Sequence, residues 1–117
     1  MGSKNPLRLG NIETLAAVHP TELEHQEGYA YLYRGRWTGL TEPDNNSFPR
    51  RSRLIVVENG KLLGPAHAAH VEIRTEGAGR YSHWEGDPPS PYLLFSTSDN
   101  SDPRSNGRLY HVGVLIW

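Results

Sequence analysis

The densest hydrogen-bonding chemistry in the sequence lies in one polar segment near the C-terminus, between residues 96 and 108. Its carboxylates, amides and guanidiniums are planar groups that can pair with the vicinal hydroxyls of a sugar. We therefore predict ligand-binding roles for Asp99, Asn100, Asp102, Arg104, Asn106 and Arg108. The segment could instead be a self-capped loop, in which Asp and Asn accept hydrogen bonds from nearby backbone N–H groups.

A calcium loop is the third interpretation of this segment. Asp99, Asp102 and Asn106 offer the hard oxygen ligands that calcium prefers. The spacing departs from the EF-hand pattern, because Pro103 and Arg104 stand where that loop needs ligands. We predict no cofactor and no metal, and we keep calcium as the exception to test.

A second candidate group is Gly79-Arg80-Tyr81-Ser82-His83-Trp84. Strand alternation would place Arg80 and Trp84 on one face and Tyr81 and His83 on the other. An exposed Trp beside an Arg suits a sugar ring, which stacks on the indole while the guanidinium binds its hydroxyls or an acid group. The alternative is that Trp84 belongs to the core.

Histidine is abundant, with six residues in 117. His67 and His70 would lie near one another if their segment turns, and His83 or His111 could join them from another strand. Imidazole suits zinc or copper, but no HExxH spacing and no cysteine supports such a site. The sequence leaves open whether these four side chains converge on a metal.

Signatures of catalysis are missing from the sequence. It contains no GxSxG elbow, no P-loop and no GxGxxG motif, and no spacing selects a pair of carboxylates. We therefore assign no catalytic residue. A small hydrolase or lyase that uses His and Asp is the least favoured of the functions considered.

The elements that must position these residues are short strands. Alternation and turn residues predict strands over residues 28–37, 53–58, 61–63, 80–84, 92–97 and 108–117. Asn59-Gly60 is a strong hairpin signal, since both central residues of a type I′ turn need positive φ. The segment 15–18 could be a strand or one helical turn, and 38–52 should be a long loop.

These elements predict an all-β fold, a small antiparallel β-sandwich or barrel with at most one short helix, around residues 67–76. We expect residues 15–117 to form a single β domain. Residues 1–14 should form a flexible segment that begins with Met1-Gly2-Ser3, which looks like a cloning remnant.

Composition excludes several classes of protein. The absence of cysteine excludes a disulfide scaffold, a thiolate zinc site and a cysteine nucleophile. A net charge of -1 argues against nucleic acid as a partner. No apolar run approaches the ~20 residues that span a bilayer, so we predict no membrane span. The compartment stays open between the bacterial cytoplasm and the cell envelope.

About half of the chain resembles a small accessory domain appended to bacterial glycosyltransferases, methyltransferases and sulfotransferases of surface-polysaccharide pathways. The resemblance is carried by GPAH at 64–67, GRYSHW at 79–84, SDNSDPR at 98–104 and NGR at 106–108. It implies a glycan-related role without catalysis, which the partner domains would supply. It also implies that this chain could be part of a larger enzyme.

The residues and the resemblance together predict a non-catalytic carbohydrate-binding domain for bacterial surface glycans with acidic substituents. Arg80 and Trp84 would join the polar segment in binding. The alternative is a structural or assembly module that packs on a partner domain or subunit through Tyr29, Tyr31 and Tyr33, which alternate along one predicted strand. The oligomeric state is open.

Overall fold

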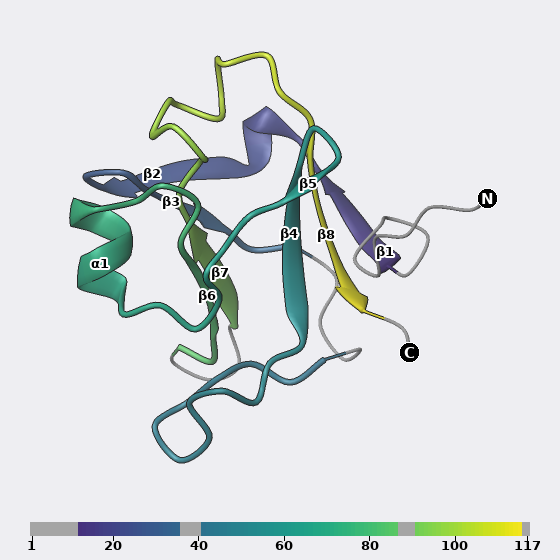
Figure 1. Cartoon of the computed structure of the whole chain (residues 1–117), viewed down its shortest axis with the longest axis vertical. Coiled ribbons are helices and arrows are strands. Elements are labelled where there is room, and N and C mark those ends of the chain that lie inside the picture. Colours follow the sequence, from purple (N-terminus) through teal and green to yellow (C-terminus); the bar gives the residue numbers. More distant parts are fainter. Residues whose placement is uncertain (1–11, 36–40, 87–90, 116–117) are drawn as a thin grey trace.

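The computed structural model describes residues 12–35, 41–86 and 91–115, which form two antiparallel sheets of four strands each (Figure 1). The first sheet has the order β1-β8-β4-β5 and the second has the order β2-β3-β7-β6. The strands are β1 (Ile12–Val18), β2 (Leu23–Glu27), β3 (Ala30–Tyr33), β4 (Leu54–Glu58), β5 (Lys61–Leu62), β6 (Tyr81–Trp84), β7 (Tyr92–Phe95) and β8 (Tyr110–Leu115). One short helix, α1 (His70–Thr75), completes the fold.

The predicted fold class, a small all-β sandwich with one short helix, is confirmed. The closing strand β8 lies between β1 and β4, as its apolar sequence indicated. The Asn59-Gly60 turn joins β4 to β5, and both residues have positive φ, 47° and 84°. Residues 15–18 belong to a strand and not to a helical turn.

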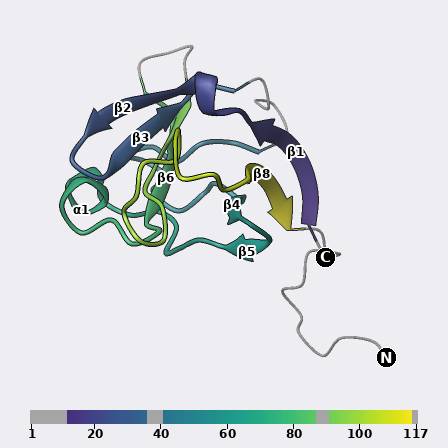
Figure 2. The same cartoon turned by 90° about the horizontal axis from the view of Figure 1, so that it is seen from above.

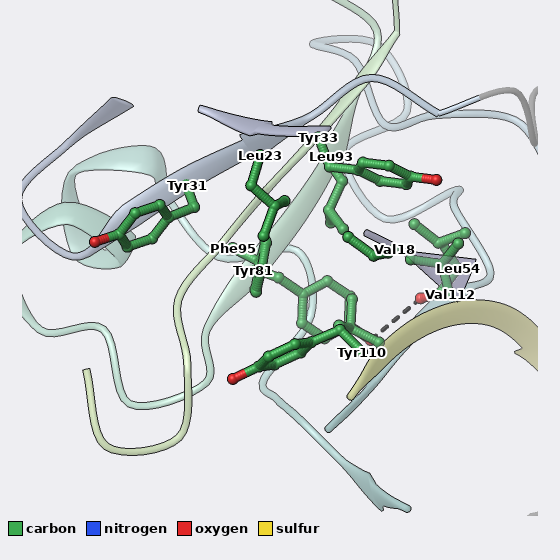
Figure 3. Packing of buried hydrophobic residues seen from close by; sticks show 11 residues of the cluster. Val18, Leu23, Tyr31, Tyr33, Leu54, Tyr81, Leu93, Phe95, Tyr110 and Val112 are labelled. Carbon is green, nitrogen blue, oxygen red and sulfur yellow. Dashed lines mark hydrogen bonds between the residues drawn. The ribbon is translucent and has the colours of Figure 1, made fainter. Parts of the chain in front are cut away.

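The two sheets face each other, and the side chains that point inward from their strands form the hydrophobic core (Figure 3). Tyr31 and Tyr33 are 7% and 2% exposed within it. The hydroxyl of Tyr81 donates a hydrogen bond of 3.1 Å to the carbonyl of Leu54 across the sandwich, and burial raises the pKa of Tyr81 to about 12. Tyr31 and Tyr33 of β3 are therefore covered by the first sheet of this chain and are not available to a partner, whereas Tyr29 is 40% exposed.

Helix α1 covers the outer face of the second sheet. Figures 1 and 2 show it on the side of β6 and β3 away from β8 and β1. Ile73 is fully buried against Ala30 and Leu94, whose strands β3 and β7 pair with one another. This second apolar cluster holds the helix against the sheet and fixes the direction of the helix's remaining side chains.

The helix is shorter than the predicted 67–76. His67 has a φ of 58°, in the left-handed region, and Ala69 is extended, so the right-handed helix begins only at His70. None of the helices in the described ranges is long and apolar enough to cross a membrane.

Strand boundaries differ from the sequence prediction at several points. Strand β1 begins at Ile12, which pairs with Leu115, so residues 12–14 belong to a sheet and not to a flexible segment. Strand β2 was not predicted, because only Leu23 of its five residues is buried and its sequence shows no apolar alternation. Strand β3 ends at Tyr33, and Trp37 and Trp117 lie outside the described residues.

Gly28, in the turn between β2 and β3, contacts the end of helix α1. The neighbouring Tyr29 N–H donates a hydrogen bond of 3.0 Å to the carbonyl of Arg74. Gly28 has a φ of 57°, and a Cβ atom there would overlap that same carbonyl oxygen. The turn and the helix can approach this closely only because residue 28 has no side chain.

We predict that Gly28→Ala destabilises the protein more than Gly107→Ala. Both glycines have positive φ, but a Cβ at Gly107 meets nothing within 4 Å. Gly107→Ala should lose about 1 kcal/mol of unfolding free energy from backbone strain alone. Gly28→Ala should lose about 1–3 kcal/mol more, since the helix must move. Urea denaturation measures both, and equal losses would contradict the proposed contact.

Candidate functional site

A cavity of about 400 Å³ opens on the outer face of the second sheet, between helix α1 and the 41–52 loop. It combines an aromatic wall with polar side chains, which is the usual composition of a small-molecule site. The lining residues that carry chemistry are Asp44, His67, His70, Ser82, Trp84 and Tyr92.

Strand alternation explains why Trp84 reaches the cavity. In β6, Tyr81 points into the core, so Ser82 and Trp84 project from the opposite face. Trp84 pairs with Tyr92 of β7 and, through an isolated parallel bridge, with Asp44. The sequence predicted that Trp84 faces away from His83 but left open whether Trp84 belongs to the core; the residue is partly exposed.

Asp44 is the polar centre of the cavity wall and is only 1% exposed. Its Oδ1 accepts a hydrogen bond of 2.7 Å from the Ser52 N–H, and its Oδ2 lies 2.6 Å from Nδ1 of His67. Its backbone joins β6, since Asp44 N donates to His83 O and Asp44 O accepts from Glu85 N. A buried carboxylate requires such partners, because desolvation strongly disfavours an unpaired charge.

His67 is held in a single orientation by Asp44. With Nδ1 bound to the carboxylate, its Nε2 makes no hydrogen bond to another described residue, and 15% of the side chain is exposed at the cavity. The left-handed backbone of His67 is uncommon for a residue with a side chain, and such strain is concentrated at functional sites. The imidazole is thus held in one orientation at the wall of the cavity.

Ser52 and His83 support Asp44 from the core side. A hydrogen bond of 2.6 Å joins Ser52 Oγ and His83 Nδ1, and Ser52 Oγ also accepts the Leu54 N–H. Burial lowers the pKa of His83 to about 4, although the nearby Asp44 carboxylate opposes this shift. His83 is therefore neutral at pH 7.

His70, the first residue of α1, forms the opposite side of the cavity. Its ring lies edge-on to Trp84, with centroids 5.6 Å apart, and 6.1 Å from the ring of Tyr92. Burial, helped by Arg74, lowers its pKa. Its Nε2 is buried and has no hydrogen-bond partner. A buried ring nitrogen without a partner is costly.

The polar loop that the sequence singled out lies at the other end of the second sheet. Trp84 pairs with Tyr92 at one end of β6 and β7, whereas Tyr81 pairs with Phe95 at the end from which the loop leaves. Figure 1 shows this loop and the 41–52 loop at opposite ends of the molecule. The structure thus separates Trp84 from the loop residues predicted to act with it.

The charges of this loop are paired with one another. Arg108 donates to both carboxylate oxygens of Asp99, at 2.9 and 2.8 Å, and Arg104 donates to both oxygens of Asp102, at 3.0 and 2.9 Å. Hydrogen bonds from Arg108 and Ser101 lower the pKa of Asp99, and those from Arg104 lower the pKa of Asp102.

The remaining predicted side chains also bind this chain itself. Asn106 donates to Ser101 Oγ and to the Tyr110 hydroxyl, at 3.1 and 2.9 Å. Asn100 accepts the N–H of Ala78 at 2.7 Å, and Arg80 forms an ion pair of 3.2 Å with Glu76.

Glu58 of β4 connects this loop to the first sheet. Its carboxylate accepts hydrogen bonds from the hydroxyls of Tyr110, at 2.6 Å, and Ser98, at 2.5 Å. Burial raises the pKa of Glu58, but the hydrogen bonds from Ser98 and Tyr110 outweigh it and lower the pKa overall. The sequence did not single out Glu58.

The four histidines considered for a metal do not form one cluster. His67 and His70 line the same cavity, whereas His83 lies on the core side of β6 and His111 lies on β8 in the other sheet. Within residues 12–35, 41–86 and 91–115, no group of three or more His, Cys, Asp or Glu side chains could hold a metal ion.

Sequence reasoning missed Asp44, Ser52 and Tyr92. Asp44 stands in a loop of ordinary turn residues, 23 positions before the histidine that it binds, so no local spacing marks the pair. Comparisons with protein-family models, curated proteins and solved structures find no significant match to this chain.

We predict that His83 makes stability depend on pH. Its pKa is depressed from 6.5 to about 4 on folding, so its contribution is complete above pH 6.5 and is lost as the pH falls toward 4. The wild type should lose about 2 kcal/mol more than His83→Gln between pH 7 and pH 5. Denaturant unfolding measures the difference, with His19→Gln, an exposed histidine, as the control. Equal pH dependence in wild type and His83→Gln would contradict the prediction.

Proposed function

We propose that this chain is a non-catalytic carbohydrate-binding domain whose ligand occupies the cavity between Trp84, Tyr92 and His67. The observation that carries the proposal is the combination of aromatic and fixed polar groups around one opening of about 400 Å³. Sugars present apolar C–H faces and rings of hydroxyls, and they need both kinds of partner.

The aromatic part of the site is Trp84 with Tyr92. The two residues are directly opposite one another on paired strands, so their side chains project from the same face of the sheet. His70 closes the space beside them and contacts both rings. A sugar ring in the cavity would bury its C–H face here.

The polar part of the site is His67, backed by Asp44. Both oxygens of Asp44 are already bound by this chain, so the group offered to a hydroxyl is the imidazole Nε2.

The polar loop is a weaker candidate for the same function. A hydroxyl that binds Asp99 or Asp102 must displace a bidentate guanidinium, which is a stronger charge-assisted partner. The glycan role expected from the sequence does not depend on which of the two sites is used.

The test is binding of the purified protein to an array of bacterial oligosaccharides. We expect affinities in the range of about 0.1–5 mM, since a small polar site exchanges water for sugar with little net gain. Trp84→Ala should weaken binding about tenfold or more, equivalent to about 1.4 kcal/mol. Trp84→Phe should lose less, because it retains an aromatic face.

Tyr29→Ala is the matched control, since Tyr29 is an aromatic residue that is 40% exposed and does not line the cavity. It should leave binding unchanged. Binding that survives Trp84→Ala but is lost in Asp99→Asn would place the ligand in the polar loop and overturn the proposed site. Binding to no glycan would overturn the proposed function.

A second candidate function is hydrolysis of a ligand in the same cavity, and the Asp44–His67 pair favours it. An imidazole oriented by a buried carboxylate is the usual form of a general base. If this candidate holds, a glycan incubated with the protein will yield products detectable by mass spectrometry. Asp44→Asn should then reduce the turnover rate about a hundredfold or more while ligand binding is retained. Unchanged glycan after long incubation would exclude catalysis.

A further inference from the structure

A second cavity, of about 190 Å³, adjoins the first on the outer face of the same sheet. His70 and Tyr92 line both cavities, so the two openings share one wall. The second cavity differs in charge, because the guanidiniums of Arg34 and Arg74 line it together with the amide of Gln26.

Arg34 is positioned by Tyr92. Its guanidinium carbon lies 5.6 Å from the centroid of the Tyr92 ring, within the range of a cation–π contact. Among the described residues it has no acidic partner and no hydrogen bond. A guanidinium stacked on an aromatic ring keeps its N–H edge available for a second partner.

Arg74 is positioned by Gln26. Its Nε donates a hydrogen bond of 3.0 Å to the side-chain carbonyl of Gln26, and Nε also lies 3.9 Å from the carboxylate of Glu27. Glu27 is largely exposed and does not line the cavity. The terminal nitrogens of Arg74 carry no hydrogen bond to a described residue.

We propose that this second cavity is a subsite for an acidic substituent, so that the chain binds glycans carrying a uronate carboxylate or a sulfate, with Arg34 and Arg74 as the recognising residues. The inference rests on the proposed function. A sugar ring against Trp84 and Tyr92 would direct a charged substituent past Tyr92 toward the two guanidiniums. Each guanidinium can bind a carboxylate or a sulfate through paired N–H groups.

The position of this subsite differs from the one that the sequence suggested. The loop arginines 104 and 108 are held by carboxylates of their own loop. No carboxylate lines the second cavity, so an anion entering it meets no like charge on the wall among the described residues.

The test is a ¹H–¹⁵N NMR titration that follows the arginine Nε–H and tryptophan indole signals. The probes are sodium glucuronate, glucose and sodium sulfate, at concentrations that would saturate a millimolar site. Glucuronate should shift the signals of Arg34, Arg74 and Trp84, whereas glucose should shift Trp84 alone. Glucuronate should also bind about tenfold more tightly than glucose.

The double variant Arg34→Gln/Arg74→Gln should bind glucuronate only as weakly as glucose, and its response to glucose should be unchanged. Arg53→Gln is the control, because Arg53 is an exposed arginine that precedes β4 in the other sheet. The single variants show which guanidinium contributes more. The dispersion of the backbone amide signals shows whether each variant is folded.

The outcomes separate this inference from the function on which it rests. Equal affinity for glucose and glucuronate, or a double variant that still prefers glucuronate, would overturn the acidic subsite and leave the sugar site in place. No response of Trp84 to either sugar would overturn the sugar site and, with it, this inference. If sulfate shifts the NMR signals of Arg34 and Arg74 in the wild type, the negative charge of the substituent is the feature that the subsite recognises.

Discussion

The buried carboxylate of Asp44 ties together three parts of the chain that are distant in sequence. Its backbone adds the 41–52 loop to the edge of β6, and its side chain holds Ser52 before β4 and His67 before α1. A carboxylate that is 1% exposed can be accommodated only when each oxygen has a partner. The loop, the cavity wall and the orientation of His67 therefore depend on one another.

The cavity exists because the helix covers only part of the second sheet. Ile73 packs over Ala30, at the start of β3, and over Leu94 of β7, while Trp84 and Tyr92 pair at one end of β6 and β7, beside His70 at the start of α1. The sandwich needs no third layer for its own core, which lies between the sheets. The helix thus adds a wall to an exposed sheet face. His70 and Arg74 lie on the same side of this helix, because they are four residues, or about one turn, apart.

The sequence was sufficient for the fold class, for most strands and for the hairpin at Asn59-Gly60, because period-two alternation and positive-φ turn residues are local signals. It was insufficient for β2, whose one buried residue gives no alternation. It overextended the helix, since apolar residues at helical spacing say nothing of the left-handed φ at His67.

Of the candidate site, alternation along β6 predicted that Trp84 and His83 face opposite ways, and the geometry agrees. The pairing of Asp44 with His67 could not be predicted, because it depends on how a 41–52 loop without regular secondary structure folds back on β6. The charged loop attracted attention by its composition, but composition does not reveal whether a guanidinium is already bound to a neighbouring carboxylate.

Whether an arginine is already paired with a carboxylate decides where a ligand can gain binding energy. A ligand at Arg104 or Arg108 must replace a bidentate carboxylate, whereas one at Arg34 meets a guanidinium with no such partner among the described residues. The loop still acts on the cavity through Asn100, which accepts the Ala78 N–H and donates to the carbonyl of Glu76, at the end of α1. Asn100 thus holds the C-terminal end of the helix whose first residue, His70, lines the cavity, and this is a structural role that needs no contact with a ligand.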